Sequence, residues 1–89
     1  ALLEYTLPLC VEFFASNKDL QKAENFLNLI PFKNWKQKEY YYLTQARLEE
    51  LYKNSPKTAL NFYEKANKEA TLSDMKKWIE KKISLLKLN

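Results

Sequence analysis

The 89-residue sequence has no glycine and no histidine, and it has one cysteine and one arginine. Tight β-hairpin turns and phosphate-binding loops rely on glycine for positive φ angles, so its absence argues against a β-rich fold and a phosphate loop. The lack of histidine removes the usual general base and the most frequent metal ligand. Helices joined by short turns fit this composition best, and the sequence predicts an all-α fold.

The remaining reactive side chains do not form a catalytic set. Cys10 lies between Leu9 and Val11 in an apolar run, so we expect an unreactive buried thiol and no internal disulfide. Glu49 and Glu50 are adjacent, and neighbouring residues on a helix point about 100° apart, which keeps their carboxylates from converging. The sequence therefore predicts no catalytic residue, no metal site, no cofactor and no enzymatic activity.

Composition and charge indicate one domain over residues 1–89, with 46% hydrophobic and 15% aromatic residues. The net charge of +4 is uneven: residues 1–32 hold two lysines against four acids, and residues 33–89 hold thirteen basic residues against seven acids. No apolar run reaches the roughly 18 residues of a membrane span. Without a signal peptide or an initiating methionine, we expect a fragment of a longer protein, cytoplasmic or periplasmic.

Hydrophobic spacing and helix signals predict five helices, over about residues 2–15, 18–30, 34–53, 56–70 and 72–88. Pro31 ends the second, and Ser55 followed by Pro56 marks the start of the fourth. Short turns imply antiparallel neighbours. The residues expected to face inward are Leu20, Ala23, Leu27 and Ile30 in the second helix, Tyr41, Thr44, Leu48 and Leu51 in the third, Ala59, Tyr63, Ala66 and Ala70 in the fourth, and Met75, Trp78, Ile79, Ile83 and Leu86 in the fifth.

The odd-numbered segments repeat with a period of 34 residues, which places Leu7 on Tyr41 and then on Met75. The even-numbered segments repeat at 36 residues, with Ala23 on Ala59. A helix–turn–helix unit with a period near 34 resembles the tetratricopeptide repeat. The shift of 34 residues also relates Cys10, Thr44 and Trp78, then Val11, Gln45 and Ile79, and finally Phe14, Leu48 and Lys82.

The resemblance is clearest in the second helix of each unit, in the segments DLQKAENFL (19–27) and ALNFYEKA (59–66). Small residues in these segments let the two helices of a hairpin approach closely. The sequence departs from the family at Lys82, where an aromatic residue is expected, and at three positions where glycine or alanine is preferred: Val11, Gln45 and Ile79. An unrelated helical bundle and a HEAT-like array are the alternatives.

The resemblance implies five antiparallel helices stacked as helix–turn–helix hairpins, a fragment of a right-handed α-solenoid. It divides the chain into repeat one over residues 4–32, repeat two over 34–70, and a final capping helix over 72–88. Two and a half repeats fall short of the roughly three that a self-sufficient stack needs. The very apolar first helix would then pack on another repeat or a second copy, or be the buried central helix of this module.

In the family, the first helices of successive repeats line a concave groove that binds partners. The 34-residue register places an acidic set of residues on that side, and we expect the groove to bind a basic or amphipathic peptide through its carboxylates. A solvated helix face is the alternative. The expected groove residues are Tyr5, Glu12, Glu39, Tyr42, Ala46, Glu49, Glu50 and Glu80.

The last helix is strongly basic, with a patch formed by Lys76, Lys77, Lys81 and Lys82. Such a helix could meet a nucleic-acid backbone or an anionic membrane surface. The near-absence of arginine disfavours nucleic acid, and lysines near the C-terminal end of a helix are favourable in themselves.

The leading hypothesis is a protein–protein interaction scaffold, part of a larger bacterial protein, that docks a partner peptide or helix. One alternative is a structural superhelical domain of a larger cell-envelope enzyme, such as a lytic transglycosylase. The other is binding of nucleic acid or an anionic surface through the lysine-rich last helix.

Overall fold

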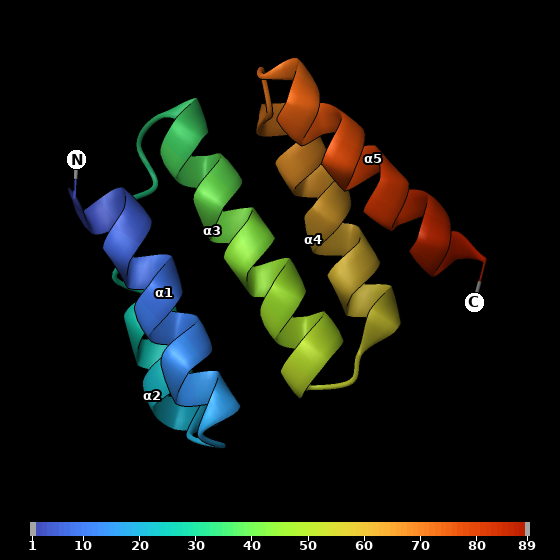
Figure 1. Cartoon of the computed structure of the whole chain (residues 1–89). Helices are drawn as coiled ribbons and strands as arrows, with labels where there is room; N and C mark the ends of the chain where they lie inside the picture. Colours follow the sequence, from blue (N-terminus) through green and yellow to red (C-terminus); the bar gives the residue numbers. More distant parts are fainter. Residues whose placement is uncertain (1, 89) are drawn as a thin grey trace.

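The computed structural model describes residues 2–88, with side chains from Thr6 onward. This part of the chain forms five α-helices and no strand, as the sequence predicts. Each helix is antiparallel to the next, so α1, α3 and α5 point the same way (Figure 1). The helices are α1 (Leu2–Ser16), α2 (Leu20–Leu27), α3 (Trp35–Arg47), α4 (Pro56–Glu69) and α5 (Ser73–Lys87), and α3 continues into one π-helical turn, η1 (Leu48–Tyr52).

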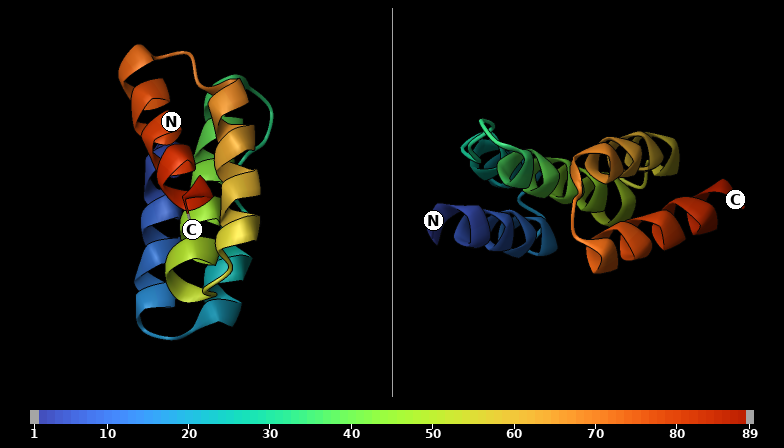
Figure 2. Two further views of the ribbon diagram at one scale, coloured as in Figure 1. Left: turned by 90° about the vertical axis from the view of Figure 1, so that its right-hand side faces the viewer. Right: turned by 90° about the horizontal axis from the view of Figure 1, so that it is seen from above.

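The helices pack pairwise in a flat slab. α2 packs on α1, α4 on α3 and α5 on α4, while α3 also contacts α1. Seen from above, α1 and α5 lie along one side of the slab and α2 and α4 along the other, with α3 crossing between the two sides (Figure 2). The Cα extents of 30 × 30 × 16 Å fit two helix layers in the thin direction, since a helix with its side chains is about 10 Å wide.

Two buried clusters take the place of a single closed core, and the continuous helix α3–η1 contributes to both. The first cluster lies between α1 and α2 and is covered by η1, and the second lies among α3, α4 and α5. The hairpins therefore succeed one another along the slab. The first cluster contains Leu7, Val11, Ala15, Ala23, Leu27, Ile30 and Leu48, and the second contains Leu43, Ala46, Ala59, Tyr63, Ala66, Ala70 and Ile79.

Local capping hydrogen bonds explain where α2 and α3 begin. The N–H of Lys22 donates to the carboxylate of Asp19, which precedes α2. Asn34 and Gln37 form a reciprocal capping box at the start of α3. Ser55 holds the N-cap position of α4, as predicted, although its side chain makes no capping hydrogen bond.

The second helix ends at Leu27, three residues before the predicted Ile30. The N–H of Leu29 donates to the carbonyl of Phe26, and that of Ile30 to the carbonyl of Leu27, so the chain leaves the helix through tight turns. Pro31 disfavours a helical conformation for the residue before it.

The prediction that Leu51 faces inward is wrong, because the third helix ends in a π-helical turn. Here the N–H of Lys53 donates to the carbonyl of Leu48, five residues back, at 3.0 Å. The wider turn changes the direction of the side chains at its end, so Leu51 is 52% exposed and Tyr52 packs on the first cluster in its place. Asn54 then ends the helix with a φ of 55°, a left-handed conformation that asparagine tolerates.

Candidate functional site

A hollow of about 400 Å³ lies between α3 and α5, and we call it the α3–α5 groove. It exists because α5 packs on α4 through the buried Ile79, and no Cα atom of α5 lies within 8 Å of one in α3. Three of its five lining residues are apolar, so it offers a mainly hydrophobic surface. The lining residues are Leu43 and Arg47 of α3 and Asp74, Met75 and Trp78 of α5.

Trp78 contributes the largest side chain of the α3–α5 groove. Helical spacing predicts an inward position, but the residue is 41% exposed. Its ring meets the buried ring of Tyr63 edge to face, with 6.2 Å between the centroids and 69° between the planes. The indole therefore rests on the core while much of its surface faces the solvent.

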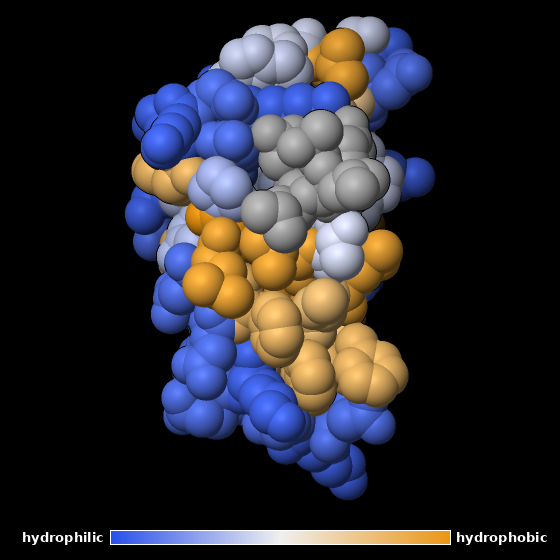
Figure 3. All heavy atoms as spheres, turned by 90° about the vertical axis from the view of Figure 1, so that its left-hand side faces the viewer, coloured by the Kyte–Doolittle hydropathy of each residue, from blue (hydrophilic) through white to orange (hydrophobic). Residues whose placement is uncertain are grey.

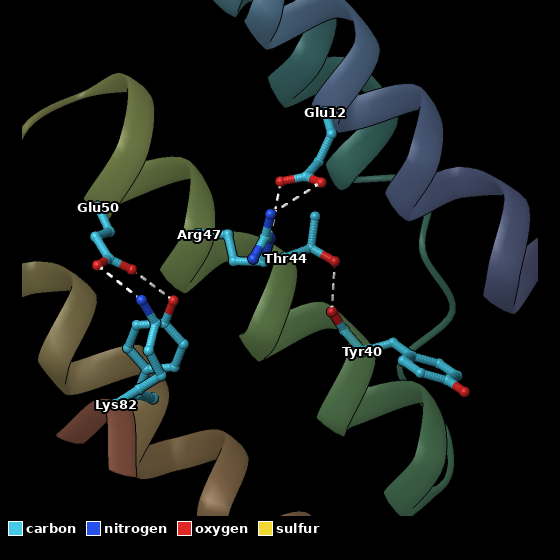
Figure 4. A network of polar contacts seen from close by, with 7 residues as sticks. Glu12, Tyr40, Thr44, Arg47, Glu50 and Lys82 are labelled. Atoms are coloured by element: carbon cyan, nitrogen blue, oxygen red, sulfur yellow. Dashed lines mark hydrogen bonds and ion pairs between the residues drawn. The ribbon is translucent and has the colours of Figure 1, made fainter. Parts of the chain in front are cut away.

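The carboxylate of Glu12 is held by Arg47 across the contact between α1 and α3 (Figure 4). The Nε of Arg47 donates to Oε1 of Glu12 at 2.8 Å, and its Nη2 donates to Oε2 at 3.3 Å. The hydrogen bond from Arg47 to Glu12 raises the pKa of the guanidinium. Because Arg47 also lines the α3–α5 groove, this bidentate pair holds a cation at the groove wall.

Glu50 links three elements through two hydrogen bonds (Figure 4). The hydroxyl of Tyr63 on α4 donates to its Oε1 at 2.7 Å, and Nζ of Lys82 on α5 donates to its Oε2 at 3.1 Å. Burial alone would raise the pKa of Glu50, but the hydrogen bonds from Tyr63 and Lys82 outweigh it and lower the pKa. Burial, and then the bond to Glu50, raise the pKa of Tyr63.

Glu49 joins η1 to α2 through Lys53. The Nζ of Lys53 lies 3.2 Å from Oε2 of Glu49 and also pairs with Glu24 of α2. Gln45 donates a further hydrogen bond to Glu49 at 2.9 Å. Burial would lower the pKa of Lys53, but its two acidic partners raise it on balance. Glu12, Glu49 and Glu50 therefore connect neighbouring elements of this chain.

The other expected groove residues lie in different environments. Ala46 is fully buried in the second cluster, and Glu39 is 3% exposed. The Oε2 of Glu39 is buried without a hydrogen-bond partner, and burial raises its pKa despite the opposing charge of Lys36. The side chain of Tyr5 lies outside the described residues.

The ring of Tyr42 is half-buried between those of Phe32 and Phe62, with centroid distances of 5.4 and 6.4 Å. Glu80 is exposed on α5. The structure therefore does not bring the expected acidic residues together on one open surface.

The predicted basic patch is divided in two. The ammonium of Lys82 is engaged by Glu50, and Nζ of Lys76 donates to the carbonyl of Asn67 at 3.1 Å. Lys77 and Lys81 are exposed. Only part of the positive charge on α5 is thus displayed to a partner.

No three side chains of the histidine, cysteine or carboxylate kind gather closely enough to hold a metal ion in the part of the chain that the structure describes. Within the same residues, no helix combines the length and the hydropathy needed to cross a membrane.

Sequence reasoning missed the α3–α5 groove. Leu43, Arg47 and Asp74 were in no predicted site, and Trp78 and Met75 were expected in the core. Arg47 is the only arginine of the sequence, and this could have pointed to a bidentate ion pair, since the guanidinium favours such pairing with carboxylates. The exposure of Trp78 had no sequence signal, because it depends on how far α5 stands from α3.

Comparisons with known proteins give no significant match to this chain, whether with protein-family models, curated proteins or solved structures.

Proposed function

We propose that this chain is a protein–protein interaction scaffold whose α3–α5 groove docks the apolar face of an amphipathic peptide or helix from a partner protein. The half-exposed Trp78 in a mainly apolar wall is the observation that carries the proposal. Ligand sites are typically apolar hollows with a few polar groups, and tryptophan is enriched among the residues that contribute most to binding.

Two oppositely charged side chains lie at the edges of the α3–α5 groove, one on each of its two helices. Arg47 offers guanidinium donors and Asp74 offers a carboxylate acceptor beside the apolar wall. The pair with Glu12 holds Arg47 before any ligand arrives, which reduces the entropy cost of binding. A docked segment with apolar side chains on one face and polar groups at its edge satisfies both features.

An amphipathic occupant fits this surface better than a purely basic one. Glu12, Glu49 and Glu50 already accept hydrogen bonds or ion pairs from basic side chains of the same chain. A basic peptide would have to displace these internal partners before it could bind.

The arrangement of the helices supports the same proposal. α1, α3 and α5 point the same way and follow one another along the slab, as the first helices of tetratricopeptide-like hairpins do. We therefore interpret the fold as two tetratricopeptide-like hairpins followed by a final helix. In such stacks the first helices contribute the partner-binding surface.

The test begins with a displayed library of short helical peptides, selected on the immobilised chain. Selected peptides should carry bulky apolar residues at helical spacing, and their affinity is measured by fluorescence anisotropy of the labelled peptide. Trp78→Ala should weaken binding at least about tenfold, which corresponds to about 1.4 kcal/mol. In a Trp35→Phe background, the emission of Trp78 should shift when the peptide binds.

Trp35→Ala is the matched control, because Trp35 is similarly exposed at 39% but does not line the α3–α5 groove. It should leave the affinity unchanged, and circular dichroism should show equal helicity in both variants. Equal affinity of the wild type and Trp78→Ala would place the binding surface elsewhere.

A further inference from the structure

A second hollow, which we call the aromatic hollow, lies between the segment that joins α2 to α3 and helix α4. Its volume of about 430 Å³ falls within the roughly 300–1,000 Å³ of small-molecule sites. It shares no lining residue with the α3–α5 groove, so it is a separate site. The residues that line it are Asn28, Ile30, Phe32, Tyr41, Tyr42, Phe62 and Lys65.

The aromatic hollow differs in position from the apolar surface at the end of the slab. Figure 3 shows apolar side chains gathered in the middle of the outer side of the first hairpin, between hydrophilic regions. A further helical unit stacked on the slab would cover such an end. The lining residues of the aromatic hollow come from both hairpins, so the hollow stays open to a ligand whether or not further units stack on the ends.

Four aromatic rings form an unbroken series in the wall of the hollow. Phe32 meets Tyr41 and Tyr42 edge to face, with 5.4 Å between the centroids in each pair. Tyr42 in turn stacks on Phe62 at 6.4 Å, with 29° between the ring planes. Tyr41 packs on the first cluster, and Tyr42 and Phe62 pack on the second. The two cores therefore hold the rings in place, while Phe32 is 45% exposed.

Two lysine ammonium groups lie against these rings. The Nζ of Lys65 is 5.2 Å from the centre of the Phe62 ring and 5.8 Å from that of Tyr42. The Nζ of Lys38 is 5.5 Å from the centre of the Phe32 ring. Aromatic walls alone would suit a cationic ligand, but these two ammonium groups would repel a further cation. None of the lining residues in the described part of the chain is acidic, so the charge selects an anion.

We propose that the aromatic hollow binds a nucleotide, with the base against the rings and the phosphate paired with Lys38 and Lys65. The flexible lysine side chains leave the ring faces for the phosphate, and the base takes their place. Stacking of a base on aromatic rings needs no arginine, so the low arginine content does not argue against this site. The exposed Asn28 offers an amide that both donates and accepts, which suits the edge of a base. The same chemistry serves a free nucleotide and one unit of a single strand.

Fluorescence anisotropy of a labelled single-stranded oligothymidylate, titrated with the chain at several salt concentrations, tests the proposal. Each phosphate contact to a single strand contributes about −0.7 to the slope of log affinity against log salt, so two lysines should give about −1.4. Lys38→Gln and Lys65→Gln should each flatten the slope by about 0.7. Phe32→Ala should weaken binding about tenfold through the loss of stacking.

Phe13→Ala and Lys77→Gln are the matched controls, because Phe13 is 61% exposed and Lys77 is exposed, but neither lines the aromatic hollow. Both should leave the affinity and the slope unchanged, and circular dichroism should show equal helicity in all variants. Absence of binding at low salt would overturn the proposal. A loss of binding in Lys77→Gln but not in Lys65→Gln would also overturn it, because the strand would then lie on α5.

Two competitors separate stacking from charge and the free nucleotide from the strand. An abasic strand of the same length should compete at least about tenfold more weakly than oligothymidylate, since it keeps the phosphates and lacks the bases. Equal competition would mean binding through charge alone and would refute the nucleotide site. Thymidine monophosphate that displaces the label at concentrations similar to those of the unlabelled strand identifies a free nucleotide as the ligand, and much weaker displacement identifies the strand.

Discussion

The two buried clusters of this chain differ in the chemistry that holds them together. Five of the seven buried residues in the first are aliphatic side chains larger than alanine, and aromatic rings pack around them. The second contains four alanines beside Leu43, Ile79 and Tyr63, and the hydroxyl of Tyr63 donates to Glu50. The first cluster therefore depends on filled volume, whereas the second depends on close helix approach and a polar link between η1, α4 and α5.

The difference has a consequence for the surfaces that the molecule exposes. α5 adds only Ile79 to the fully buried residues of the second cluster, and it is held to η1 by the pair of Lys82 with Glu50. Because α5 packs on α4 and not on α3, the α3–α5 groove stays open. The first hairpin has more large aliphatic side chains in its core, and it exposes Leu9 and Phe13 of α1 to the solvent.

The largest effect is expected where volume is removed from the first cluster. Leu48→Ala should lower the free energy of unfolding by about 3 kcal/mol, because Leu48 is 1% exposed and the truncation leaves a cavity between the two hairpins. Urea denaturation followed by circular dichroism measures the change. Leu51→Ala, at an exposed position only three residues away, should change the stability little.

The second largest effect is expected when the hydroxyl of Tyr63 is removed from the second cluster. Tyr63→Phe should lower the free energy of unfolding by about 2 kcal/mol, since the lost hydrogen bond has a charged acceptor, Glu50. The pKa of Glu50 is lowered in the folded state, so its contribution is present at neutral pH and is lost as the pH falls through that lowered value. Tyr63→Phe should therefore be less sensitive to acid, as measured by denaturation across the acidic range.

A gain in stability is expected from Glu39→Gln, on the order of 1 kcal/mol at neutral pH. The carboxylate of Glu39 is buried with one oxygen unpartnered, and burial raises its pKa above the usual 4.5. A raised folded pKa means that wild-type stability falls as the pH rises through it. The advantage of Glu39→Gln should thus vanish below the unfolded value. An advantage that persists in acid would contradict the electrostatic explanation.

The smallest effect concerns the pair that joins α1 to α3. Both side chains are partly exposed, at 38% for Arg47 and 33% for Glu12, so a double-mutant cycle with Glu12→Gln and Arg47→Gln should give a coupling of at most about 1 kcal/mol. Added salt should reduce it. A coupling of several kcal/mol would make this pair as important as the cluster it flanks.

Some of the fold could be predicted because it depends on nearby residues. The spacing of Ala59, Tyr63 and Ala66 predicts one buried helix face, and all three residues are buried. Ser55 followed by Pro56 predicts the start of α4, where the structure has it. Position 51 could not be predicted, because one extra residue in a π-helical turn moves Tyr52 into its place.

The candidate site was less predictable, since it depends on contacts between distant residues. A helical register shows that Glu12 leaves the core face, but not that Arg47, 35 residues later, pairs with it. The same holds for Glu50, whose partner Lys82 lies 32 residues away. Even burial escaped the helical register, since Glu39 and Glu49 were expected on an open groove and are 3% and 7% exposed.

The amino-acid sequence alone determined the five helices and the close contact of α3 with α4, because periodicity, capping residues and small side chains act over a few residues. The tertiary structure alone decided which charges are paired and which apolar side chains remain open. Both properties depend on the separation and rotation of packed helices, which the 34-residue period does not specify. For that reason Glu12, Glu49 and Glu50 link neighbouring elements, and Trp78 forms part of the wall of a groove.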